Sequence, residues 1–257
     1  MTNSIEVQGL RKSYGDFSLR DINLTVPGGA IMGLIGENGA GKTTTIKCIL
    51  NLIRRDEGTI TLLGHDNQRE ERAAKLEIGV VLDECFFHDS LRPRDIDLIL
   101  SRIYQGWDSA LYQRYLSKFQ LPERKFVKEF SRGMKMKLSL AAALSHRPKL
   151  LILDEATAGL DPIVRDEILD EFLGFIQDDD HAILISSHIT SDLEKAADYI
   201  TYIHQGQVVL SDAKDRILDN YGRLACTAAQ LNSVAPDDLI RVPVSYTHLR
   251  AHETVLD

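Results

Sequence analysis

The hydrophobic pattern alternates between short continuous apolar runs and longer stretches in which apolar residues recur every three or four positions. The runs are typical of strands buried on both faces, and the recurrence is typical of helices that cover such strands. This alternation predicts an α/β protein with a mainly parallel sheet. The predicted strands are residues 5–10, 17–26, 30–35, 59–63, 78–82, 150–153, 182–185, 199–204 and 207–210, the last two forming a hairpin.

Helical spacing marks five further stretches, which are residues 45–52, 70–76, 162–176, a helix from Ser191, and 212–221. From about residue 91 to 147 the strand pattern stops and charged sequence with helical periodicity replaces it. We expect this stretch to be a helical insert within the α/β core.

A glycine-rich loop follows the apolar run at 30–35 and precedes a helix. It matches the pattern G-x-x-x-x-G-K-[ST], in which successive backbone N–H groups turn toward a phosphate at a helix N-terminus. Lys42 is expected to reach the β- and γ-phosphates, and the Thr43 hydroxyl to bind Mg²⁺. The predicted nucleotide-binding residues of this loop are Gly36, Asn38, Gly39, Gly41, Lys42, Thr43 and Thr44.

A pair of carboxylates ends the apolar run at 150–153, about a hundred residues after the glycine-rich loop. In a nucleotide triphosphatase, such a strand delivers one carboxylate to Mg²⁺, so Asp154 is the predicted metal ligand. Glu155 is the predicted group that polarises the attacking water. Acidic residues often end apolar strands, so the carboxylates alone are a weak signal. Their position about a hundred residues after the phosphate loop is what indicates a nucleotide site.

Composition narrows the class further. The chain has 257 residues, of which 44% are hydrophobic and 26% charged, typical of a soluble globular protein. No apolar run reaches the ~18 residues of a membrane span, and the first residues lack the features of a signal peptide. The three cysteines have no metal or redox spacing. A net charge of −8 argues against a nucleic-acid-binding protein.

Four further segments carry a resemblance to a known family. Phe130-Ser131-Arg132-Gly133-Met134 resembles the LSGGQ signature of ABC-transporter ATPase subunits. Residues 158–161 resemble the family's D-loop, and residues 186–188 resemble its switch-histidine loop. Tyr14 occupies the place of the adenine-stacking aromatic residue. The resemblance covers roughly residues 5–221, with the motifs in the family's order.

The resemblance implies a P-loop NTPase core with a mainly parallel sheet, an N-terminal antiparallel β subdomain and the inserted helical subdomain. It implies ATP and Mg²⁺ as cofactors and a head-to-tail dimer with a second ATPase subunit. Ser131 and Gly133 would bind the partner's γ-phosphate, Asp161 would lie in the D-loop, and His188 would contact the phosphate and hold Glu155. Structural readings remain open for Ser131 as a helix N-cap, His188 as a surface histidine and Tyr14 as a loop aromatic.

Two departures from the family pattern stand out. Arg132 and Met134 replace a glycine and the glutamine of the signature. Asp83 stands where the family usually has the Q-loop glutamine. A carboxylate there could still bind Mg²⁺, so Asp83 is a third candidate metal ligand with Thr43 and Asp154. Phe86 to His88, just beyond, either contact a membrane partner or pack under the helical insert.

The pattern most resembles the ATPase subunits of ABC-2-type bacterial exporters. We therefore expect an ATP-hydrolysing subunit that drives a separate transmembrane permease from the inner, cytoplasmic face of the membrane. One alternative is a soluble ABC ATPase that acts outside transport, although the chain has a single cassette and no long heptad run. The other is a regulatory nucleotide switch, which an intact Glu155 disfavours and Asp83 leaves open.

The domain boundaries follow from the same resemblance. We expect an ATPase domain at 1–222, with its helical insert at about 91–147, and the start of a truncated accessory segment at 223–243. Residues 244–254 resemble an in-frame translation of a sequencing-library adapter. We therefore expect 244–257 to be a non-native tail and set aside its histidines, His248 and His252, as a metal pair.

Overall fold

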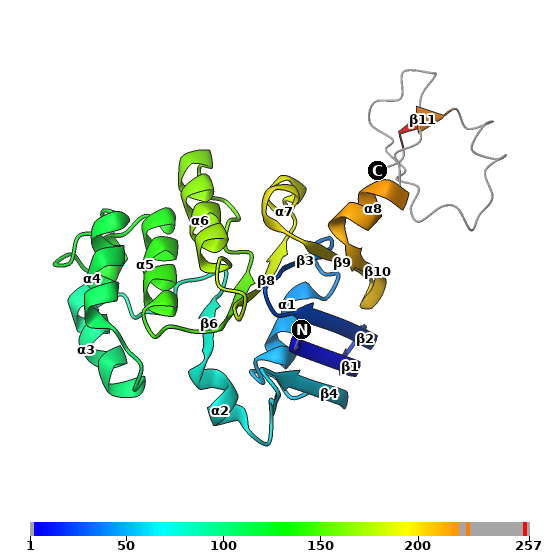
Figure 1. Ribbon diagram of the computed structural model, residues 1–257, viewed down its shortest axis with the longest axis horizontal. Coiled ribbons are helices and arrows are strands. Elements are labelled where there is room, and N and C mark those ends of the chain that lie inside the picture. Colours follow the sequence, from blue (N-terminus) through cyan, green and yellow to red (C-terminus); the bar gives the residue numbers. More distant parts are fainter. Residues whose placement is uncertain (1–2, 221–224, 227–253, 256–257) are drawn as a thin grey trace. The chain divides into compact units, whose positions relative to one another are not determined.

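A computed structural model describes residues 3–220, 225–226 and 254–255. The chain divides into two compact units, Met1–Ser211 and Asp212–Asp257, which are described separately. The first unit contains two sheets and the helices that surround them (Figure 1).

The larger sheet has six strands in the order β10-β9-β3-β8-β7-β6. The pairs β6–β7, β7–β8, β8–β3 and β3–β9 are parallel, which confirms the predicted parallel sheet. Every residue of β7 and β8 is buried, as their continuous apolar runs predict. The strands are β3 Ile31–Ile35, β6 Ile78–Val81, β7 Leu150–Asp154, β8 Ala182–Ser187, β9 Tyr199–His204 and β10 Gln207–Ala213.

The smaller sheet is antiparallel, with the order β2-β1-β4-β5. Its strands are β1 Asn3–Tyr14, β2 Phe17–Pro27, β4 Glu57–Leu62 and the two-residue β5 His65–Asp66. The inner face of β1 joins a hydrophobic cluster that also contains residues of the first helix and of the larger sheet, such as Ile46 and Ile152. This cluster attaches the antiparallel sheet to the part of the protein that carries the phosphate loop.

The helical insert is confirmed between β6 and β7, where α3, α4 and α5 lie together away from the antiparallel sheet (Figure 1). Its core contains Tyr112, Leu116 and Leu140, which pack in one cluster with β7 residues such as Leu151. The helices of this unit are α1 Lys42–Ile49, α2 Glu71–Leu76, α3 Pro93–Ile103, α4 Ser109–Lys118, a 3-10 turn Val127–Glu129, α5 Arg132–Leu144, α6 Pro162–Phe175 and α7 Thr190–Ala196.

The helix after the phosphate loop differs from the prediction at both ends. It begins at Lys42 rather than residue 45, and it ends at Ile49 rather than residue 52. Asn51 has a positive φ of 52°, a left-handed conformation that cannot continue a right-handed helix. The apolar spacing beyond Ile49 therefore belongs to a turn, in which Leu50 is buried and Leu52 is exposed.

The second unit begins with α8 Lys214–Asn220, two residues later than predicted because β10 extends to Ala213. Two short strands, β11 Ala225–Cys226 and β12 Thr254–Val255, pair with each other. The expected accessory segment at 223–243 and the expected tail at 244–257 otherwise lie outside the described residues. In the part of the chain that the structure describes, no helix is both long and apolar enough to cross a membrane.

Candidate nucleotide site

The phosphate loop connects the end of β3 to the start of α1, so its backbone amides lie at a helix N-terminus. Gly39 and Gly41 have φ values of 82° and 116°, which favour glycine. Gly36 is required for a different reason, because a Cβ there would lie 2.4 Å from the Ile203 carbonyl oxygen of β9. The loop thus takes the form that its glycines predict.

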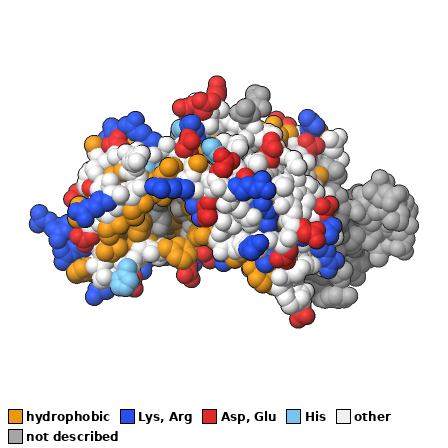
Figure 2. All heavy atoms as spheres, turned by 90° about the horizontal axis from the view of Figure 1, so that it is seen from below, with side chains coloured by type: hydrophobic (Ala, Val, Ile, Leu, Met, Phe, Trp, Pro, Cys, Tyr) orange, Lys and Arg blue, Asp and Glu red, His pale blue; other side chains and the backbone are white. Residues whose placement is uncertain are grey.

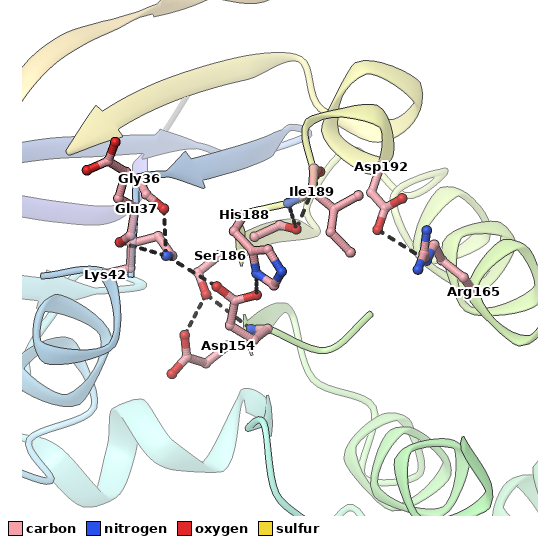
Figure 3. Close-up of polar contacts among 11 residues, drawn as sticks. Gly36, Glu37, Lys42, Asp154, Arg165, Ser186, His188, Ile189 and Asp192 are labelled. Carbon is pink, nitrogen blue, oxygen red and sulfur yellow. Dashed lines mark hydrogen bonds and ion pairs between the residues drawn. The ribbon is translucent and has the colours of Figure 1, made fainter. Parts of the chain in front are cut away.

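Lys42 points back along this loop (Figure 3). Its side chain is buried, and Nζ donates hydrogen bonds to the Gly36 oxygen at 2.8 Å and the Glu37 oxygen at 3.4 Å. The same Nζ lies 3.2 Å from Oε1 of Glu155. The ammonium group predicted to bind phosphate is therefore paired with the carboxylate predicted to activate water.

Asp154 ends β7 and is 2% exposed. Its carboxylate accepts hydrogen bonds from Ser186 Oγ, at 2.5 Å, and from the Thr43 side chain. Burial raises the pKa of Asp154, and Asp83 and Glu155 raise it further, while the two hydroxyls oppose the shift. A buried carboxylate beside a threonine hydroxyl, with negative charge nearby, is a site that a cation stabilises.

Glu155 has a positive φ of 52°, which is rare for a residue other than glycine. Its amide donates to the oxygen and to the Oγ of Ser186, at 3.2 and 3.1 Å, and these contacts hold the unusual backbone in place. Oε2 of Glu155 lies 2.6 Å from Nδ1 of His188 (Figure 3). The carboxylate therefore contacts Lys42 with one oxygen and His188 with the other.

Lys42, Thr43, Glu155 and His188 line one open pocket of about 560 Å³, whereas the predicted site residues Gly36 and Asp154 are not among its lining residues. Mg²⁺ usually binds to proteins through one or two side-chain oxygens and completes its shell with water and substrate phosphates. Thr43, Asp154 and Asp83 supply that kind of donor set. The pocket is lined by Phe17, Glu37, Asn38, Gly39, Gly41, Lys42, Thr43, Thr44, Asp83, Arg132, Glu155, Ala158 and His188.

Comparison with known proteins identifies the family. Residues 19–158 match the family model described as "ABC transporter". The chain belongs to the ABC transporter family. It is an ATP-binding and ATP-hydrolysing subunit of the kind that powers transport, as its sequence motifs predict.

Relatives with curated names cover most of the chain. The bacitracin transport ATP-binding protein BcrA of Enterococcus faecalis is 36% identical over 208 residues, which are 80% of this chain and 68% of BcrA. The lantibiotic transport ATP-binding protein SrtF of Streptococcus pyogenes is 36% identical over 214 residues, 82% of this chain and 91% of SrtF. The predicted resemblance to ABC-2-type exporters agrees with these names.

Solved structures show the same fold. An ATP-binding subunit of an ABC transporter has a TM-score of 0.76 and 29% identity, and the match covers 84% of this chain and 92% of that one. A dimeric, post-hydrolysis ATP-binding cassette bound to ADP and phosphate has a TM-score of 0.72 at 20% identity, covering 81% and 98% of the two chains. The predicted P-loop NTPase fold is thus confirmed.

Several predicted site residues lie outside this pocket. Ser131 caps α5, accepting from Met134 N at 3.2 Å, and Asp161 caps α6, accepting from Val164 N at 3.0 Å. Gly133 lies in the first turn of α5. Tyr14 is 46% exposed and packs against the Lys12 ammonium group, 5.1 Å from its ring centre.

Sequence reasoning did not name Phe17 or Glu37 as site residues, and it named Arg132 only as a departure from the signature, yet all three line the pocket. Phe17 pairs with Tyr14 across the turn between β1 and β2, so the pocket-lining ring stands directly opposite the aromatic residue that the sequence predicted. Arg132 stands at the start of α5, and a Cβ on Gly159 would lie 3.0 Å from its Nη1. Its replacement of a signature glycine was the signal that pointed to it.

A second pocket, of about 310 Å³, lies beside β6, which is the edge strand of the larger sheet. Phe86 is 74% exposed at this pocket, whereas Phe87 packs against the core of the helical insert. Packing against the helical insert, one of the two alternatives for this segment, therefore holds for Phe87. His88 is exposed and accepts a hydrogen bond from the Ser90 amide.

Proposed function

We propose that the chain hydrolyses MgATP with Glu155 as the group that orients and polarises water, and that this reaction drives export through a separate permease. The observation that carries the proposal is the chain of contacts from Lys42 through Glu155 to His188. It joins a phosphate-binding cation, a carboxylate base and a histidine within one pocket. BcrA is named for bacitracin transport and SrtF for lantibiotic transport, which supports a peptide-antibiotic substrate class.

The residues divide the chemistry among them. Thr43 and Asp154, with Asp83 at the pocket wall, would hold Mg²⁺, which when bound neutralises charge on the β- and γ-phosphates. Lys42 would leave Glu155 and turn to the phosphates, because the triphosphate carries more negative charge than one carboxylate. His188 would keep Glu155 in place through the contact at Oε2. The freed Oε1 of Glu155 would then face the attacking water.

A second copy of the chain, or a related subunit, would complete each site. Ser131 and Gly133 lie at the N-terminus of α5, and Asp161 lies at the N-terminus of α6. Helix N-termini bind phosphate well, and Ser131, Gly133 and Asp161 do not line the pocket of their own chain. The dimeric cassette among the similar structures supports a head-to-tail pair.

Hydrophobic side chains beside β6 support a membrane partner. Figure 2 shows hydrophobic side chains gathered, with basic ones beside them, on the face that carries α2 and the end of α3. Exposed apolar patches of this kind are typical of interaction sites. We infer that a permease segment docks here and holds the chain at the inner face of the membrane. The exposed apolar residues are Leu76, Val80, Phe86, Leu98, Ile99 and Ile103.

Mixed dimers test the split site. Ser131→Arg and Lys42→Ala should each abolish ATP hydrolysis alone, but a mixture should regain a measurable fraction of wild-type activity. In the mixed dimer one site combines the intact Lys42 of one chain with the intact Ser131 of the other. The control mixture of Lys42→Ala with Glu155→Gln should stay inactive, because these residues belong to the same half of a site. Equal recovery in both mixtures, or in neither, would contradict the proposal.

Membrane docking is tested separately. Phe86→Asp should lower the fraction of the chain that sediments with membranes of cells that contain its permease, while ATP binding stays unchanged. Val209→Asp is the matched control, because Val209 is exposed on β10 at the opposite edge of the same sheet. An equal loss with both variants would show that the hydrophobic face beside β6 is not the docking surface. A soluble ABC ATPase or a regulatory switch would show no membrane-bound fraction with either variant.

A further inference from the structure

A buried ion pair connects the two segments that follow the catalytic residues (Figure 3). Arg165 lies in α6, which begins after the D-loop at 158–161, and Asp192 lies in α7, which begins after His188. The Asp192 side chain is 3% exposed and that of Arg165 is 25% exposed. Arg165 Nε lies 3.8 Å from Oδ2 of Asp192.

The contact is not a complete hydrogen bond. Arg165 Nε and Asp192 Oδ2 are both buried, and neither has a hydrogen-bond partner. A buried charge without such partners is destabilising unless another group compensates it. A distance of 3.8 Å exceeds an ordinary charged hydrogen bond by about 1 Å. A shift of about 1 Å between the two side chains would therefore turn this contact into a charged hydrogen bond.

Each member of the pair is attached to a functional loop. Arg165 Nη2 donates to the backbone oxygen of Leu160, in the D-loop, at 3.2 Å. Asp192 is the third residue of α7 and lies four residues after His188, whose Nδ1 contacts Glu155. The guanidinium group thus joins the D-loop backbone to α7, the helix that begins two residues after His188.

We propose that Arg165 and Asp192 are positioning residues that set the position of His188 relative to the D-loop, and so hold His188 on Glu155. The inference rests on the proposed function, in which the D-loop faces the partner subunit. Closing the 3.8 Å gap when the dimer forms would move α7 toward α6. The closed pair would then keep His188 on Glu155, which it already contacts at 2.6 Å, while the dimer forms.

The same two helices contain a matched control. Asp166 of α6 and Lys195 of α7 form an ion pair at 2.9 Å, with side chains that are 60% and 62% exposed. Exposed pairs contribute little to stability. This pair bridges the same elements as Arg165 and Asp192 but contacts neither the D-loop nor the switch loop among the described residues. A variant of this pair therefore tests whether any ion pair between α6 and α7 is enough, or whether the pair beside the D-loop is required.

The first experiment compares Asp192→Asn with Asp166→Asn. For Asp192→Asn we expect kcat for ATP hydrolysis to fall at least tenfold, with KM for ATP within twofold of wild type. For Asp166→Asn we expect both constants within twofold. Arg165→Gln, at a less buried position, should cause the same fall in kcat. It replaces Asp192→Asn in this experiment if the Asp192→Asn protein fails to fold. Unchanged kcat in a folded Asp192→Asn or Arg165→Gln protein would overturn the inference.

The second experiment asks whether the pair acts through His188. In a His188→Ala background, which retains only residual activity, Asp192→Asn should cause no further loss, because the group that it positions is already absent. A further tenfold loss there would overturn the inference. If wild type and Asp166→Asn have no ATPase activity, the proposed function itself fails. If both hydrolyse ATP and Asp192→Asn does so equally well, only the positioning inference fails.

Discussion

Replacing Glu155 by glutamine should separate the binding of ATP from its hydrolysis. Lys42 Nζ lies 3.2 Å from Glu155 Oε1, and the two side chains are only 6% and 16% exposed. A hydrogen bond to a charged group contributes about 1.5–3 kcal/mol, and ATP must break this one to engage Lys42. The glutamine oxygen still accepts a hydrogen bond from the ammonium group but carries no charge, so the substitution should remove about half of that energy.

A change of about 1.4 kcal/mol is tenfold in affinity, so Glu155→Gln should bind ATP roughly three- to tenfold more tightly. Turnover should fall by about 10² to 10⁴, the usual contribution of a general base. Affinity is measured with a fluorescent ATP analogue, without Mg²⁺ and at protein concentrations too low for dimers. Turnover is measured as phosphate release with Mg²⁺.

Asp83→Asn is the control for this experiment, because it removes a carboxylate from the same pocket without touching Lys42. Its ATP affinity should change far less than that of Glu155→Gln. Equal gains in both variants would mean that general charge repulsion, not the release of Lys42, controls affinity. Turnover near the wild-type value in Glu155→Gln would refute the assignment of Glu155.

Three further outcomes are expected. Asp83→Ala should raise the Mg²⁺ concentration for half-maximal ATPase activity. Glu84→Ala should not, because the Glu84 side chain lines the other pocket. A shift in Glu84→Ala alone would make Glu84 the metal ligand in place of Asp83. Burial lowers the pKa of His146, so this histidine stays neutral in the folded protein while the unfolded chain binds a proton below about pH 6.5. Unfolding free energy should therefore fall as the pH drops from 6.5, and His146→Phe should show a shallower fall in urea titrations at several pH values. Gly206→Ala should lower Tm by several degrees, since a Cβ there would lie 2.0 Å from the Ser18 oxygen, and more than Gly64→Ala, which has a similar φ and open space.

Much of the larger sheet and the phosphate loop could be predicted from the sequence. Five consecutive buried residues, as in β7, require a strand that is covered on both faces, which is typical of a parallel sheet. The spacing of Gly36, Gly41 and Lys42 is set by the geometry of the phosphate that the loop surrounds. The ends of helices were predicted less well where the backbone conformation of a single residue determines them. Asn51 ends α1 through a left-handed conformation that the apolar spacing around it does not encode.

The contacts between distant segments could not be predicted. Phe17 lines the pocket because the hairpin between β1 and β2 turns its ring toward Gly41, which depends on the register of the two strands. Arg165 and Asp192 are 27 residues apart, and nothing in either helix alone indicates a buried partner. Such pairs depend on how α6 and α7 pack, which hydrophobic periodicity does not specify. Motifs therefore located the chemistry, and packing determined which side chains support it.

The left-handed backbone at Glu155 bears on how this site can change during evolution. Asparagine, aspartate and glycine adopt that conformation most readily, and each would remove or shorten the carboxylate while the loop keeps its shape. A β-branched residue would instead strain the backbone that Ser186 holds. After gene duplication, one substitution at this position can silence hydrolysis in a copy that still folds and binds nucleotide. Asymmetric pairs, with one active and one silent ATPase, are therefore a single mutation away.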